Sequence, residues 1–302
     1  MRDQTELIRP MKQKVWGWPA VANFILGGMA SGCYVLALIM RGVREHESVV
    51  ADLGIPGLLA ATLVASGFLI LTLEAGRPAR SIHLLRHLRR SWMSRETLAA
   101  LIFIPAAALG QFVPSRVLWF IAGAAAIGLV VSQGFIVYRA RAVTAWNVLI
   151  IPLGFVTSGL AAGSGLILLQ VVGAGAAVDH ALIAVGLICA ALDLAVWLGY
   201  LLWPGAAFQD ATHALRRPPA LMQIVGFGRV LPLLLLMWST PSESRDVLHS
   251  TVIALAGLAL IAGGMMQKAA IIIKAGYLRG IVLGPSRAPI APIDSRREGE
   301  LT

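Results

Sequence analysis

The sequence predicts an all-α, polytopic integral membrane protein built as a bundle of eight transmembrane helices. Hydrophobic residues make up 58% of the chain and charged residues only 13%, whereas soluble domains average roughly 25% charged residues. The apolar residues form long runs, and a helix needs about 20 such residues to cross the hydrocarbon core of a bilayer. Polar, mostly basic segments separate these runs, which predicts a chain that crosses the membrane repeatedly.

The predicted spans cover residues 19–40, 53–73, 97–113, 117–138, 147–172, 178–203, 222–239 and 247–268. An even number of spans places both termini on the same side of the membrane. The seventh span contains Arg229, and Pro232 would kink it because proline lacks a backbone donor. We therefore divide the chain into an N-terminal segment, a membrane domain and a C-terminal tail, at residues 1–18, 19–275 and 276–302.

The distribution of Lys and Arg predicts which side each end faces. Nineteen of the 25 basic residues fall on the side of the termini, and only Arg41, Arg44, Arg116 and Arg245 fall on the other side. Positive charge in short loops marks the cytoplasmic face of a membrane protein. Both termini and the basic segment 74–96 are therefore predicted to be cytoplasmic, and the net charge of +10 mainly reflects this topology.

Other sequence features narrow the class of protein further. The N-terminus lacks the charged, apolar and small-residue regions of a signal peptide, so the first apolar run is predicted to remain as a span. The two cysteines, Cys33 and Cys189, both lie in apolar runs and form no CxxC motif. We expect no metal or haem on this chain.

Small residues recur in several spans, as in GGMASG from Gly27 to Gly32 and GLAAGSG from Gly159 to Gly165. Small residues let helices in lipid approach closely. These glycines predict either tight helix packing or room for a flat ligand, and we treat Gly27 and Gly28 as candidate ligand contacts.

Three segments resemble one family when they are taken together: WGWPAVANFILGGMASG in the first span, LEAGRPARSIHLLRHLRRSWMSRE after the second, and SQGFIVYRARAVTAWN at the end of the fourth. They resemble the NrfD, polysulfide reductase and DMSO reductase family of membrane anchor subunits. The resemblance covers about residues 15–150. It implies an anchor that binds a quinone within the first four spans and associates with two partners, an iron–sulfur subunit and a molybdopterin catalytic subunit.

The resemblance also implies quinone contacts, with departures from the family pattern. Asn23 stands where polysulfide reductase anchors have a histidine near the tryptophans that open the first span. Ser132 stands where they have a tyrosine in the fourth span, and Gln133 or Tyr138 can take its place. Arg77 belongs to a GRP turn that matches the family.

Two residues are the predicted acid–base groups. Glu74 takes the place of a quinol-linked histidine, and it lies at the membrane edge, where an ionisable residue is functional by default. The alternative is that Glu74 has only a structural role and forms an ion pair with Arg77 or Arg80. His83 follows in the same segment, where it could conduct protons or contact the quinone directly.

The remaining charges of this segment are predicted to dock an acidic face of the iron–sulfur partner, because such charges aid encounter and orientation. The predicted docking residues are Arg80, Arg86, His87, Arg89, Arg90 and Arg95.

Asp193 and Arg229 both lie within spans, where an unpaired charge is costly. We expect them to pair, either as a structural lock or as part of a proton path.

The sequence therefore predicts the quinone-reducing anchor of a cytoplasm-facing molybdenum or tungsten oxidoreductase in a bacterial inner membrane. The chain itself is expected not to act on the organic or sulfur substrate. The first span most resembles anchors whose partner oxidises phenylacetyl-CoA, and an anchor for sulfite dehydrogenase, polysulfide reductase or DMSO reductase is the alternative. A dihaem anchor is disfavoured because His249 is the one histidine read inside a span, near its non-cytoplasmic end, and the others lie in loops or at span ends. A secondary transporter is disfavoured because the two halves show no repeat.

Overall fold

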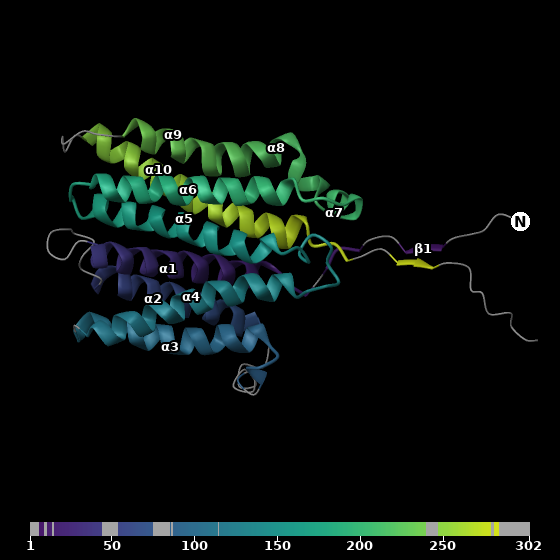
Figure 1. The fold of residues 1–302 in the computed structure, drawn as a ribbon, viewed down its shortest axis with the longest axis horizontal. Helices are drawn as coiled ribbons and strands as arrows, with labels where there is room; N and C mark the ends of the chain where they lie inside the picture. The colour runs from purple at the N-terminus through teal and green to yellow at the C-terminus, as the bar shows by residue number, and fades with distance from the viewer. Residues whose placement is uncertain are drawn as a thin grey trace, which may run out of the picture.

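The computed structural model describes residues 6–8, 11–13, 15–43, 54–74, 85, 87–113, 115–239, 247–278 and 281–283. The predicted fold class is confirmed: eight helices in this part of the chain are long and apolar enough to cross a membrane. They run side by side in an elongated bundle (Figure 1).

The first half of the bundle contains α1 (Trp18–Val43), α2 (Gly54–Glu74), α3 (Trp92–Phe112) and α4 (Arg116–Tyr138). The second half contains α5 (Ile150–Gly173), α6 (His180–Leu201), the short α7 (Ala206–Ala211), η3 (His213–Arg216) and α8 (Pro218–Leu221). It ends with η4 (Met222–Val230), α9 (Leu231–Trp238), α10 (Val247–Ala269) and η5 (Ala270–Lys274). In Figure 1, α3 and α9 lie at opposite edges, and α1 and α5 lie near the centre.

The glycine-rich segments pack two central helices against each other. A Cβ on Gly32 of α1 would overlap the Gly159 carbonyl of α5, and a Cβ on Gly163 would overlap the Cys33 nitrogen. Only glycine permits backbones to approach this closely, which confirms the packing prediction for these positions. The contact joins the first half of the bundle to the second.

Large apolar side chains cover the outside of the bundle. Phe120, Ile188 and Leu255 are each at least half exposed. Such exposure would be unusual in a soluble protein but suits helices that face lipid.

The seventh span is continuous despite its charge and its proline. It begins as α8, widens into the π-helix η4, and ends as α9 with Pro232 in its first turn. Proline is tolerated in the first turn of a helix, because a donor there has no partner within the helix. The π segment contains Arg229.

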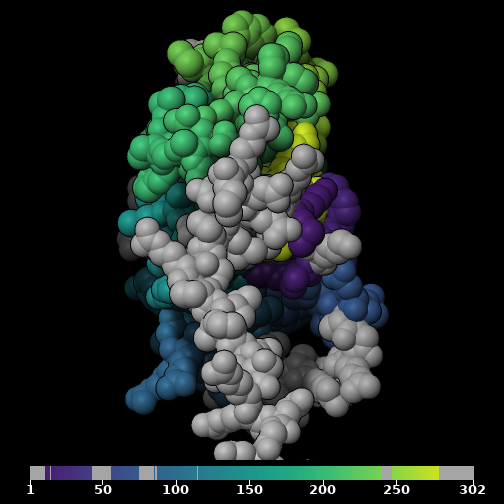
Figure 2. All heavy atoms as spheres, turned by 90° about the vertical axis from the view of Figure 1, so that its right-hand side faces the viewer, coloured from purple at the N-terminus to yellow at the C-terminus, as the bar shows by residue number. Residues whose placement is uncertain are grey.

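A two-stranded sheet joins the two ends of the chain, and the sequence did not predict it. β1 (Glu6–Ile8) pairs antiparallel with β2 (Ile281–Leu283), and Lys12 forms a further bridge with Tyr277. Figure 2 looks onto this end of the bundle, where N-terminal and C-terminal residues lie next to each other. β1 and β2 therefore lie on the same side of the bundle, as eight spans require.

Candidate functional site

A cavity of about 680 Å³ opens between the first four helices, at the end of the bundle that holds the termini. Most of its wall is apolar, with Phe24, Phe68, Leu71, Leu101 and Ile136 among the lining residues. Polar side chains line it at few positions, and two of these, Asn23 and Glu96, are buried. An apolar slot with a few convergent polar groups is the usual form of a small-molecule site.

Glu96 reaches this cavity because α3 begins earlier than the sequence predicted. The predicted span started at residue 97, whereas the helix starts at Trp92 with Ser91 as its N-cap. The Ser91 hydroxyl accepts a hydrogen bond from the Ser94 backbone nitrogen at 3.3 Å. Glu96 therefore lies inside the helix, and only 4% of it is exposed.

Two amide side chains bind the Glu96 carboxyl group from neighbouring helices. Asn23 Nδ2 of α1 donates to Glu96 Oε1 at 2.9 Å, and Gln133 Nε2 of α4 donates to the same oxygen at 3.1 Å. Gln133 Nε2 also donates to the Asn23 carbonyl at 3.2 Å. These bonds fix a carboxyl group at the cavity wall between α1, α3 and α4.

The same group leaves unused hydrogen-bonding capacity. Asn23 Oδ1 and Gln133 Oε1 are buried, and neither has a hydrogen-bond partner among the described residues. A buried polar atom without a partner is costly, and a catalytic role or a bound molecule is one explanation for it. These residues fit a quinone, which needs an apolar slot for its ring, polar groups near its oxygens and a group that can exchange a proton.

The structure brings some of the predicted ligand residues together. Asn23 and Glu74 line the cavity, and Gln133 binds Glu96 behind the wall. Ser132 is buried and Tyr138 is half-buried, but neither is among the residues that line the cavity. Arg77 and His83 lie outside the described residues.

Gly27 and Gly28 border side chains of the protein. A Cβ on Gly27 would overlap Gln133 Nε2, and a Cβ on Gly28 would overlap Lys268 Nζ. These two glycines leave room for polar side chains that approach α1 from α4 and α10.

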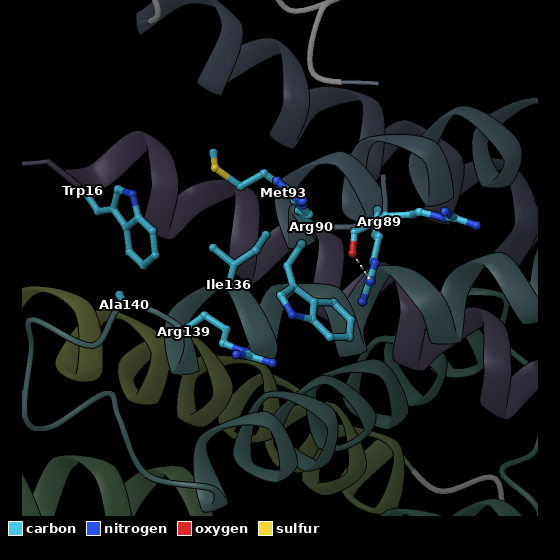
Figure 3. Close-up of a pocket in the computed structure, with 9 residues that line it drawn as sticks. Trp16, Arg89, Arg90, Met93, Ile136, Arg139 and Ala140 are labelled. Atoms are coloured by element: carbon cyan, nitrogen blue, oxygen red, sulfur yellow. Dashed lines mark hydrogen bonds between the residues drawn. The ribbon is translucent and has the colours of Figure 1, made fainter. Parts of the chain in front are cut away.

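A second pocket lies beside the cavity and is strongly basic. Its volume is about 380 Å³, and it shares Trp16, Met93 and Ile136 with the cavity wall. Figure 3 shows these three shared residues with Arg89, Arg90 and Arg139 around the pocket. We call this the basic pocket. Its arginines are Arg89, Arg90, Arg95 and Arg139.

Aromatic side chains hold part of the basic pocket in place. The Arg95 guanidinium lies 4.2 Å from the centre of the Trp92 ring and donates to the Leu88 and Arg89 carbonyls at 3.0 Å. Trp92 in turn stacks on Phe135 with ring centres 4.3 Å apart. His87 precedes Arg89 by two positions in the sequence, and its side chain is exposed. Arg80 and Arg86 lie outside the described residues.

The predicted ion pair in the second half of the bundle is confirmed. Arg229 Nη2 lies 3.0 Å from Asp193 Oδ2, and both side chains are almost fully buried. Thr157 also donates to Asp193 Oδ1 at 3.0 Å, and Arg229 donates to the Ile224 carbonyl and to Gln267 Oε1. Each charge is therefore both paired and hydrogen-bonded, as buried charges require.

Sequence reasoning missed Glu96 and Lys268 as site residues. Glu96 carried a usable signal, since it follows Ser91 in an N-capping pattern that starts the helix before the apolar run. Lys268 stands at the end of a predicted span, where a lysine usually extends to the membrane surface; here it is buried.

Comparison with known proteins supports the resemblance. Residues 6–114 match the family described as polysulphide reductase, NrfD. This match contains α1, α2, α3 and two of the polar cavity residues, Asn23 and Glu96. No curated protein matches the chain. The family match over residues 6–114 and the eight apolar helices together support an NrfD-type membrane anchor.

Proposed function

We propose that this chain is the quinone-reducing anchor of a cytoplasm-facing molybdenum or tungsten oxidoreductase. NrfD-type proteins are generally membrane anchors of molybdopterin oxidoreductases that interact with quinones. The observation that carries the proposal for this chain is the apolar cavity between α1 and α4, with the Asn23–Glu96–Gln133 group at its wall.

The residues of the cavity suit the two tasks of such a site. The apolar lining would hold the ring in a slot that excludes most water, and the Asn23 side chain would orient it through a hydrogen bond. Glu96 can hold a proton or release it, and Glu74 at the mouth is exposed to solvent. A quinone supplies the two-electron redox chemistry when it is bound, while the chain provides position and protons.

The basic pocket supports the docking of an acidic iron–sulfur partner. Its arginines make no ion pair with a carboxylate among the described residues, so their charge is available to a partner. A cluster bound there would lie next to the quinone cavity, because the two pockets share part of their walls. In this proposal, electrons pass from the partner's cluster to the quinone.

We propose that the catalytic partner lies in the cytoplasm, because the basic residues gather at the end of the bundle that holds both termini. A cytoplasmic enzyme suits a substrate found inside the cell, such as an acyl-CoA thioester, with phenylacetyl-CoA as the first candidate. A sulfur-compound oxidoreductase is the alternative.

The proposal is tested by purifying the tagged chain from its native host in a mild detergent. Mass spectrometry of the purified material should identify an iron–sulfur protein and a molybdopterin protein, and lipid extraction should recover a quinone. A control preparation with an unrelated tagged membrane protein identifies non-specific lipids. Recovery of the chain without these subunits and without a quinone would contradict the proposal.

A further inference from the structure

Four acidic or basic side chains are buried among the described residues: Glu96, Asp193, Arg229 and Lys268. Asp193 and Arg229 neutralise each other as an ion pair. Glu96 stands at the cavity wall with two amide donors. Lys268 is left without an ion-pair partner in the described part of the chain, although it is only 1% exposed.

Lys268 lies next to the quinone cavity, on the other side of the α1 backbone that forms part of the cavity wall. Its Nζ donates to the Phe24 carbonyl at 2.9 Å, and Phe24 lines the cavity together with the preceding Asn23. Gly28 provides the space for the ammonium group, because a Cβ there would overlap Nζ. The cation therefore lies directly behind the stretch of α1 that carries Asn23.

Gln133 connects this cation with Glu96. Its Nε2 binds Glu96, and its Oε1 and Lys268 Nζ both lie within 4 Å of the position that a Cβ on Gly28 would take. Gln133 Oε1 is buried and accepts no hydrogen bond from any described residue, Lys268 included. The amide thus donates to the carboxyl group on one side, and its free oxygen lies on the side of α1 where the ammonium group is.

The other charges near these groups are few. Around Lys268, α5 and α9 contain no charged side chain, and the arginine of α1 lies in its last turn. Asp193 of α6 interacts electrostatically with Lys268, but its carboxylate is bound directly by Arg229. Around Glu96, the cavity exposes Glu74 at its mouth, and Arg95 points to Trp92. The four buried charges sum to zero only when Glu96 is a carboxylate.

We propose that Lys268 is the counter-charge of Glu96 and acts as a positioning residue for proton release at the quinone site. This inference rests on the proposed function. When the iron–sulfur partner supplies two electrons, the O–H bond of Glu96 breaks and an O–H bond forms on a quinone oxygen. The second proton enters from water at the cavity mouth. The Lys268 ammonium stabilises the carboxylate that remains, which a buried site would otherwise disfavour.

Infrared difference spectroscopy on the full-length chain with added decylubiquinone tests this inference without a catalytic partner. Electrochemical reduction should remove the band of a protonated carboxyl group, and Glu96→Gln identifies that band. The glutamine in Lys268→Gln can still donate to the Phe24 carbonyl. We expect the loss of the carboxyl band on reduction to be about tenfold smaller in this variant, because no positive charge compensates the Glu96 carboxylate. Lys268→Arg keeps the charge and should restore the signal.

Lys274→Gln is the matched control, since this exposed lysine ends the same run of helix and its loss changes the net charge equally. The control should give the wild-type band. A wild-type band in Lys268→Gln would overturn the role of Lys268 and leave the quinone site intact. If wild-type protein binds no decylubiquinone, the proposed function fails, and the inference fails with it.

Discussion

Asn23 of α1 donates a hydrogen bond to Glu96 of α3 across 2.9 Å, inside a membrane helix bundle. The two residues are 73 positions apart in the sequence, and both side chains face the cavity between the first four helices. An ionisable group inside a membrane bundle is costly, and we therefore propose that this pair marks the site of the chemistry.

Replacing Glu96 with Gln should slow quinone reduction by the purified complex at least about 100-fold, because a positioned acid–base group contributes about 10²–10⁴ in rate. Steady-state reduction of decylubiquinone measures the effect. Glu74→Gln is the comparison, since sequence reasoning favoured Glu74 and the structure places it, exposed, at the cavity mouth. A larger loss in Glu74→Gln than in Glu96→Gln would contradict our assignment.

Replacing Asn23 with Ala should weaken quinone binding by about tenfold, which corresponds to the loss of one hydrogen bond of about 1.4 kcal/mol. Equilibrium titration of the detergent-solubilised chain with a quinone analogue gives the dissociation constant. Ser31→Ala is the matched control, because Ser31 is buried in the same helix but does not line the cavity. Equal dissociation constants for wild type and Asn23→Ala would rule out the proposed contact.

Removing Asp193 alone should destabilise the bundle by about 3–5 kcal/mol, because Arg229 would remain as a buried charge without its partner. Thermal unfolding in detergent should show a lower transition temperature for Asp193→Leu. The double variant Asp193→Leu with Arg229→Met should recover much of the loss, since it removes both charges. If the double variant unfolds at the same temperature as the single one, the pair is not the main source of the effect.

The topology can be tested with introduced cysteines, because the native Cys33 and Cys189 are both buried. His87→Cys is exposed at the end that holds the basic pocket, and Ala177→Cys is exposed in the loop between α5 and α6. In intact cells, an impermeant maleimide that reaches the outer face of the inner membrane should label Ala177→Cys and spare His87→Cys. The reverse pattern would place the basic pocket outside and exclude a cytoplasmic partner.

Reversing the charges of Arg89 and Arg90 to Glu should slow association with the iron–sulfur partner at least about tenfold at low salt, because rim charges act mainly on the rate of encounter. Surface plasmon resonance at several salt concentrations separates the charge effect from a folding defect. Salt should reduce the difference in association rate between the variant and wild type if that difference comes from charge. Arg116→Glu at the far end of α4 is the control and should associate like wild type. Equal rates for all three proteins would argue against docking at the basic pocket.

Hydropathy alone predicted the eight spans, since each is a long apolar run bounded by polar residues. The sequence also predicted the pairing of Asp193 with Arg229, because an unpaired charge within a membrane span is costly and these two charges can neutralise each other. Glu96 was missed because a hydropathy window ends a span where charge begins, whereas the helix continues to its N-cap at Ser91.

The environment of Lys268 could not be read from its own helix. Its burial depends on Gly28 and on the Phe24 carbonyl of α1, and Phe24 is 244 residues away along the chain. Sequence periodicity describes one helix at a time and does not reveal which residues of two distant helices meet. The pairing of β1 with β2 is non-local in the same way, because it joins the two ends of the chain.

The central claim is that the cavity beside Glu96 binds a quinone, and photoaffinity labelling with an azido-quinone tests it most directly. After illumination of the purified chain, peptide mass spectrometry should find the label on cavity-lining residues of α1, α2 and α3, such as Phe24, Leu71 and Leu101. Excess unmodified quinone should suppress this labelling. Label confined to the lipid-facing surface, or unaffected by the competitor, would contradict the claim.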